Sequence, residues 1–163
     1  MPTEDDAVET LLTTTRTWAV VGVSPDPSRA SHRVARSLLG WGFDVLPVNP
    51  ASTEVLGLPC FASLGALPAS PQVDVVDVFR RSAEAGVHVD EAIEIGARGV
   101  WLQLGVVDEA AAERARVAGL LVVMDRCPAI EYPALLRAGK IAAKCRDSGS
   151  SSSSWRRWSD RKK

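Results

Sequence analysis

The sequence is short of the residue types that build disulfide-stabilised and metal-binding proteins. It has three cysteines and two histidines among 163 residues. Cys60, Cys127 and Cys145 stand far apart, form no C-x-x-C pair and leave one cysteine over in any disulfide pairing. Zinc-ligand spacing, a P-loop and a nucleophile elbow are also missing. We therefore expect a reducing, cytoplasmic environment and no bound metal.

Long apolar runs and a strong net charge are missing too. No segment approaches the roughly 18 to 20 continuous apolar residues that cross a bilayer. The acidic start, MPTEDDAVETLL, lacks the basic region that opens a signal peptide. The sequence thus predicts a cytoplasmic protein without membrane attachment. The net charge is −1, but residues 146–163 hold six basic and two acidic residues, which leaves residues 1–145 acidic.

The length and an apolar content of 46% suit one domain with a real core, which we place at residues 1–145. The remaining residues, 146–163, are rich in serine and predict a disordered tail. Its segment WRRW interleaves aromatic and basic residues, as nucleic-acid-binding segments do. The segment is short, so we do not expect a nucleic-acid partner.

Five apolar runs of five to seven residues predict the strands of a parallel sheet. Such runs are typical of strands that are buried on both faces. They lie at residues 18–23, 43–48, 73–79, 100–104 and 120–124. Segments with helical apolar spacing alternate with them. The alternation predicts an α/β fold, a single doubly wound parallel sheet of about five to six strands with helices on both faces.

Smaller elements are expected at the edges of this pattern. Cys60 and Phe61 could form a short strand, and residues 64–67 at most a helical turn. Asp5 or Asp6 could cap a first helix that packs on the sheet from outside.

The segment between the first predicted strand and the next helix is typical of a phosphate site. Gly22 ends the strand, and the lack of a side chain would let a ligand approach the backbone. Ser28 or Ser31 can cap the helix, whose amide groups and positive dipole end would face the same space. Arg29 and Arg33 add guanidinium groups that suit phosphate. The alternative is a stiff loop with an ordinary cap and solvated arginines.

This loop differs from a standard NAD site. Gly22 is followed by no second or third glycine, so the spacing G-x-G-x-x-G is absent. The second strand ends in Val48, Asn49 and Pro50, without the acidic residue that holds the NAD ribose. Asn49 offers a donor and acceptors without charge, which suits an adenosine. The pattern predicts a phosphate-bearing nucleotide other than NAD.

Six segments in order resemble the small, single-domain CoA-binding proteins, whose Rossmann-like fold is shared with the CoA-binding domain of the succinyl-CoA synthetase α subunit. Together they span about residues 15–135. The segments are VGVSPDPSRASHRVA at 21–35, VLPVNP at 45–50, VLGLPCFASL at 55–64, VDVVDVFRR at 73–81, GVWLQLG at 99–105 and VVMDRCPAIEY at 122–132.

The resemblance implies a protein that binds coenzyme A or an acyl-CoA at the carboxyl edge of the sheet. The phosphates would lie on the first loop and the helix after it. Gly22, Val23 and Ser24 would line them, with Arg29 and Ser31 nearby. As a binding or sensing module, such a protein would be non-catalytic.

The resemblance also implies where the rest of the ligand lies. Val48, Asn49 and Pro50 would flank the adenosine. The family often has a basic residue next, which could meet the 3′-phosphate, but this sequence has Ala51 and Ser52. Preference for CoA over a nucleotide without that phosphate is therefore left open.

The opposite wall of the crevice would come from the next two strands. The resemblance assigns Phe79 and Arg80 to it, and Gln103 would reach it from the neighbouring strand.

Catalytic groups are few. Cys127 is the best candidate nucleophile, because it follows a strand and Arg126 beside it could lower the pKa of the thiol. Asp125 and Arg126 are more simply an ion pair, and His32 is expected on a helix surface. We expect binding without catalysis. The alternatives are an enzyme acting on a CoA thioester or another nucleotide, and an interaction protein that senses NAD or an adenine nucleotide.

Overall fold

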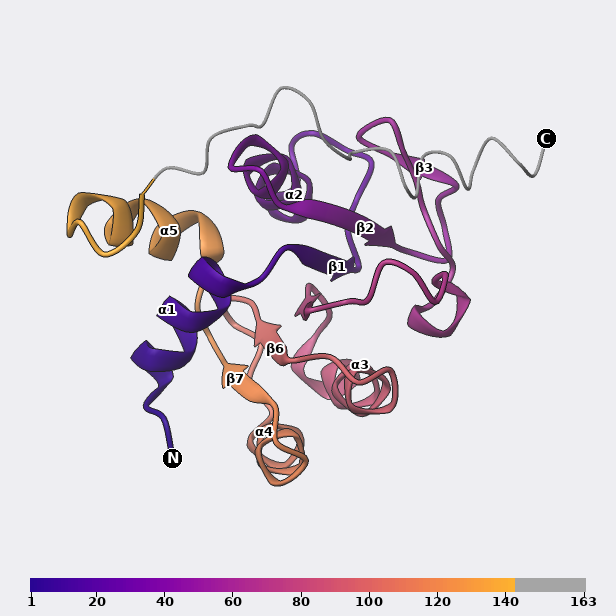
Figure 1. Cartoon of the computed structure of the whole chain (residues 1–163). Coiled ribbons are helices and arrows are strands. Elements are labelled where there is room, and N and C mark those ends of the chain that lie inside the picture. The colour runs from indigo at the N-terminus through magenta and orange to yellow at the C-terminus, as the bar shows by residue number, and fades with distance from the viewer. Residues whose placement is uncertain (143–163) are drawn as a thin grey trace.

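One parallel sheet forms the middle layer of the computed structural model, which describes residues 1–142 (Figure 1). Its strands lie in the order β2-β1-β5-β6-β7, and all neighbouring pairs are parallel. They are β1 (Thr17–Val21), β2 (Asp44–Val48), β5 (Val75–Val78), β6 (Gly99–Leu102) and β7 (Leu121–Val123). This confirms the predicted fold class, a Rossmann-like doubly wound sheet.

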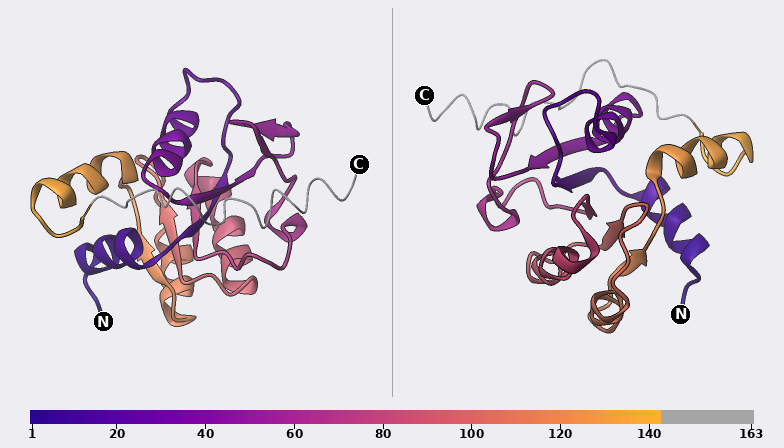
Figure 2. Two further views of the ribbon diagram at one scale, coloured as in Figure 1. Left: turned by 45° about the horizontal axis from the view of Figure 1, so that its top comes forward. Right: turned by 180° about the vertical axis from the view of Figure 1, so that it is seen from behind.

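Helices cover both faces of the sheet (Figures 1 and 2). One layer holds α1, α2 and α5, and the other holds α3 and α4. Their bounds are α1 (Glu4–Thr14), α2 (Ala30–Gly40), α3 (Ser82–Glu94), α4 (Glu109–Val117) and α5 (Pro128–Arg137). Successive strand residues point to opposite layers, as in β1, where Trp18 joins the α1/α2/α5 side and Ala19 the α3/α4 side.

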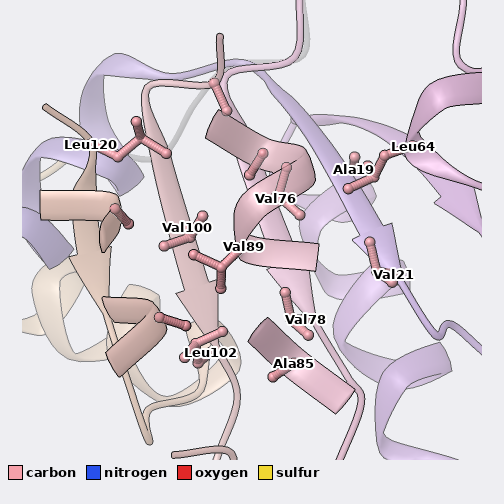
Figure 3. Packing of buried hydrophobic residues seen from close by; sticks show 14 of the residues in the cluster. Ala19, Val21, Leu64, Val76, Val78, Ala85, Val89, Val100, Leu102 and Leu120 are labelled. Carbon is pink, nitrogen blue, oxygen red and sulfur yellow. The ribbon is translucent and has the colours of Figure 1, made fainter. Parts of the chain in front are cut away.

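The α3/α4 side is packed with aliphatic residues. Figure 3 shows Val76 and Val78 of β5 and Val100 of β6 beside α3, which contributes Ala85 and Val89. All five side chains are fully buried. Each buried valine contributes about 1.5–3 kcal/mol, so this layer stabilises the packing of α3 on the sheet.

The opposite side is packed with aromatic rings. Trp18 lies 5.5 Å from Phe43 and 5.6 Å from Trp101, measured between ring centroids. Trp41, directly after α2, stacks on Tyr132 of α5 at 4.3 Å. These contacts hold α2 and α5 against the same face of the sheet.

The first helix begins two or three residues earlier than its acidic residues suggested. Thr3 is the N-cap: its hydroxyl accepts the amide of Asp6 at 3.1 Å, and the Asp6 carboxylate accepts the Thr3 amide at 2.9 Å. The expectation that Asp5 or Asp6 caps the helix was wrong, because both lie inside the first turn. Asp6 is instead the partner in a capping box.

The stretch between β2 and β5 holds small elements. A hairpin of β3 (Glu54–Val55) and β4 (Leu58–Pro59) precedes η1 (Leu64–Ala66), the expected helical turn. Phe61 makes a single parallel bridge to Val48. The strand expected at Cys60 and Phe61 is thus reduced to this bridge, and the hairpin ends just before it.

No helix within residues 1–142 is long and apolar enough to cross a membrane. The predicted tail at 146–163 and Cys145 lie outside the described residues, so the domain boundary at 145 stays a prediction.

Candidate functional site

The chain changes direction in the sheet between β1 and β5. From β1 it passes through α2 to β2 on one side, and it then crosses back to β5 on the other side of β1. In open parallel sheets, ligands bind outside the carboxyl ends of the strands at such a point. The candidate site is therefore the edge where β1 and β5 end.

Gly22 follows β1 directly and lies close to the ends of the two strands that flank β1, which are β2 and β5. Its amide donates to the Val48 carbonyl at 2.8 Å. Its φ is +83°, and a Cβ at this position would lie 2.8 Å from the Phe79 carbonyl oxygen and 3.3 Å from Nε of Arg80. The protein's own backbone thus requires glycine here. Sequence reasoning had attributed the requirement to the ligand.

The loop after Gly22 is held by its own side chains. The Ser31 hydroxyl accepts the Ser24 amide at 3.0 Å, and Nδ1 of His32 donates to the Ser24 carbonyl at 3.0 Å. Asp26 accepts the amide of Ser28 at 2.9 Å and its hydroxyl at 2.8 Å, and these bonds lower the pKa of Asp26. His32 is buried, which corrects its expected placement on the helix surface.

The amino end of α2 therefore has no side-chain cap. Its N-cap residue is Arg29, no side chain accepts the first amides, and no acidic residue lies in the first turn. The expectation that Ser28 or Ser31 would cap it was wrong, because both hydroxyls bond within the loop. Arg29 is exposed, and Arg33 donates to the Ser28 carbonyl at 2.8 Å. Open amides and two guanidinium groups make this end attractive to an anion.

Asn49 ties the end of β2 to the loop. Its Nδ2 donates to the Val23 carbonyl at 2.8 Å, and its Oδ1 accepts the Ala51 amide at 2.9 Å. The side chain thus brings Val23 next to the β2 end, and an adenosine contact by Asn49 stays a prediction. Pro50 and Ala51 beside it are exposed, and Ser52 is half-buried.

The three residues expected on the opposite wall differ in their surroundings. Arg80 lies over Gly22, as its Nε contact shows, and Phe79 is half-buried against the α1/α2/α5 layer. Gln103 is buried, and its Nε2 donates to Oδ1 of Asp77 at 2.7 Å. Arg80 thus joins the Gly22 loop, whereas the Gln103 amide is engaged inside the protein.

Asp77 is a fully buried carboxyl group that sequence reasoning missed. It lies in β5 with 0% exposure, and its Oδ2 has no hydrogen-bond partner within residues 1–142. Burial raises the pKa of Asp77 to about 8, although the bond from Gln103 opposes the shift. The signal was in the sequence: one acid interrupts the apolar run VVDVF, and an isolated buried acid is rare.

Cys127 is the N-cap residue of α5 and is half-buried. Burial is the main reason why the pKa of its thiol is raised. Activation by the neighbouring arginine was therefore a wrong expectation. Arg126 pairs with Asp5 at 2.7 Å and with Glu131 at 3.5 Å. The expected pair with Asp125 is absent, since Asp125 accepts a loop amide instead.

Residues 1–142 contain no cluster of three His, Cys, Asp or Glu side chains that could hold a metal ion.

Comparison with known proteins places the chain in a family. The family model for a CoA binding domain matches residues 16–133. An uncharacterised protein of Bacillus subtilis, YneT, is 35% identical over 120 residues, which cover 74% of this chain and 87% of that protein. This chain belongs to the CoA binding domain family.

Solved structures agree in fold. A hypothetical protein from Pyrococcus horikoshii OT3 is 37% identical, with a TM-score of 0.77 over 83% of this chain and 96% of that one. A dinucleotide-forming acetyl-coenzyme A synthetase of Candidatus Korarchaeum cryptofilum, solved with phosphate and ADP, is 26% identical with a TM-score of 0.61. The match covers 72% of this chain but 27% of the synthetase, so the likeness is to one part of that larger protein.

Proposed function

We propose that this protein binds coenzyme A or an acyl-CoA at the ends of β1 and β5, as a binding or sensing module without turnover. One observation carries the proposal within the CoA binding domain family: the amino end of α2 is uncapped and basic, and it lies beside the Gly22 loop. A helix end of this kind suits a diphosphate.

The diphosphate of the ligand would take its hydrogen bonds from the start of α2. Arg29 is exposed at the N-cap position, and Arg80 lies over Gly22 from the other strand. The two guanidinium groups come from opposite sides of the switch point, so they can neutralise a diphosphate together. Ser24 and Ser31 contribute by holding the loop in place, because their amide and hydroxyl bond to each other.

The adenosine would lie against the end of β2. Val48, Asn49 and Pro50 come next to the loop through the Asn49–Val23 hydrogen bond. Ala51 and Ser52 provide no positive charge for the 3′-phosphate. We therefore expect affinity to depend mainly on the diphosphate and on the pantetheine part of CoA.

Native mass spectrometry of freshly purified protein tests the proposal. We expect one CoA per chain, retained when equal amounts of ADP and NAD compete. Saturation by ADP or NAD with no preference for CoA would contradict the assignment. Arg29→Ala should weaken the CoA complex. Arg116→Ala in the last turn of α4 is its matched control, because it removes a guanidinium group away from the proposed site.

A further inference from the structure

We propose that Cys127 is a site of covalent acyl capture, in which the thiol accepts the acyl group of an acyl-CoA and the buried Asp77 carboxylate accepts the thiol proton. The inference rests on the proposed function, because the acyl donor is the CoA thioester held at the switch point.

The backbone brings Cys127 and Asp77 to the same face of the sheet. Asp77 of β5 is the register partner of Trp101 in β6. The Trp101 indole N–H donates to the Arg126 carbonyl at 2.8 Å, and the Arg126 amide donates to the Leu102 carbonyl at 3.4 Å. The segment after β7 is thus fastened across β6, on the face of the sheet to which Trp101 and Asp77 point. Cys127 is the next residue.

The charge of Asp77 acts on the thiol of Cys127. A charge on Asp77 raises the pKa of the Cys127 thiol, as does Glu131, while the backbone amides of Ala129 and Ile130 act in the opposite direction. Asp77 is fully buried, faces Gln103 through one oxygen only and leaves the other oxygen without a partner within residues 1–142. An unpartnered buried oxygen is costly unless it gains a proton or a donor, and the Cys127 thiol on the same face of the sheet can supply a proton.

The raised proton affinity of Asp77 suits it to accept a proton from a thiol. Burial raises the pKa of Asp77 to about 8, close to the range of a thiol. A base whose pKa lies near that of the group it deprotonates can exchange a proton with it in either direction.

The proposed step balances without an oxidant or a metal. The Cys127 sulfur forms a bond to the thioester carbonyl carbon while the thiol proton passes to Asp77. The carbon–sulfur bond to CoA then breaks, and the leaving CoA thiolate takes the proton back from Asp77. The products are acyl-Cys127 and free CoA, one acyl group for each chain, so the step is a capture and not a turnover.

The step has a defined pH dependence. Only ionised Asp77 can accept the proton, and the ionised fraction grows as the pH rises toward about 8. We expect the rate of capture to rise about tenfold per pH unit below this value and to level off above it.

Acetyl-CoA is the probe for the test. After incubation, denaturing intact-mass analysis and peptide mapping should find one acetyl group on Cys127, absent from Cys127→Ser and retained in Cys60→Ser. Cys60 is the matched control, because burial also raises the pKa of its thiol but no buried carboxyl contributes to the shift. Native mass spectra of the same samples report the noncovalent CoA complex. A complex without an adduct would overturn the capture and leave the proposed function standing, whereas no complex would overturn both.

Asp77→Asn tests the proton acceptor. The pKa of Asp77 is raised above its ordinary value of 3.8, so the folded state binds the extra proton and wild-type stability should fall as the pH rises from about 4 to 8. The asparagine variant should fold without this loss and capture acetyl slowly at every pH. Capture by this variant with the wild-type pH profile would overturn the role of Asp77. Should it not fold, a wild-type profile that is flat between pH 6 and 9 would overturn it equally.

Discussion

Two helices that begin at the same edge of the sheet have opposite amino ends. α4 follows β6 and is closed by Asp108, whose carboxylate accepts the Ala111 amide at 3.0 Å, with Glu109 in the first turn. α2 follows β1, has Arg29 in the equivalent N-cap position, and has no side-chain cap and no acid in its first turn. One helix end satisfies its own amides and repels anions, whereas the other leaves its amides and a positive charge available.

The difference shows that the fold alone does not define the site. A cap normally contributes about 1 kcal/mol to a helix, and α2 goes without it although two serines lie near its start. Those serines bond inside the loop and keep it in shape. The α2 helix therefore lacks the stabilisation of a cap at the place where the family relationship predicts a phosphate.

The largest effect is expected from changing Gly22, the glycine in the loop beside the uncapped amino end of α2. Gly22→Ala should lower CoA affinity by more than about 100-fold and destabilise the protein by roughly 1–3 kcal/mol, because its Cβ meets the Phe79 carbonyl. Gly119→Ala is the matched control, since Gly119 has a similar φ of +88° with no atom within 4 Å of the added Cβ. Calorimetric titration measures the CoA affinity of each variant, and urea unfolding measures its stability. Equal effects of the two variants would show that the close approach is unimportant.

The second-largest effect is expected when α2 receives an aspartate N-cap like that of α4. Arg29→Asp supplies a cap and a negative charge, so we expect the helix to gain about 1 kcal/mol while CoA affinity falls about 10- to 100-fold. A titration and a thermal unfolding curve of the same sample separate the two results. Unchanged affinity in a stabilised variant would contradict the phosphate site.

The reverse change removes the N-cap side chain of α4. Asp108→Ala should cost about 1 kcal/mol of stability and leave CoA affinity unchanged, because Arg29 and the Gly22 loop adjoin the start of α2 and not that of α4. Urea unfolding and a CoA titration check this, and a loss of affinity would place part of the ligand near α4.

The smallest effect is expected at the 3′-phosphate. Dephospho-CoA should bind within about tenfold of CoA, since Ala51 and Ser52 carry no charge. Competition between the two ligands in calorimetry tests this expectation. A much larger preference for CoA would mean that another basic residue reaches the 3′-phosphate.

The fold was predictable because its signals are strong and local. The five strands are buried and mainly apolar, and such runs pair in parallel only when helices cover both faces. The switch point followed from the order of strands and helices, and with it the location of Gly22, Arg29 and Asn49. The family was recognised from its motifs, because composition and periodicity alone predicted no more than a phosphate-bearing ligand.

Side-chain partners were less predictable, because they depend on neighbours far away in sequence. Thr3 precedes the acids that were expected to cap α1, and Ser31 turns toward Ser24 instead of capping α2. Arg126 reaches Asp5, over a hundred residues away in sequence, so its charge does not activate Cys127. The Gln103 amide meets Asp77 because both residues point to the same face of the sheet.

Amide shifts in a ¹H–¹⁵N spectrum titrated with CoA test the central claim most directly, because they report on the two helix ends in one experiment. The account predicts the largest shifts at residues 22–24 and 30–32, with the amides of residues 109–111 unmoved. Shifts centred on the start of α4, or none at the start of α2 under saturating CoA, would contradict it.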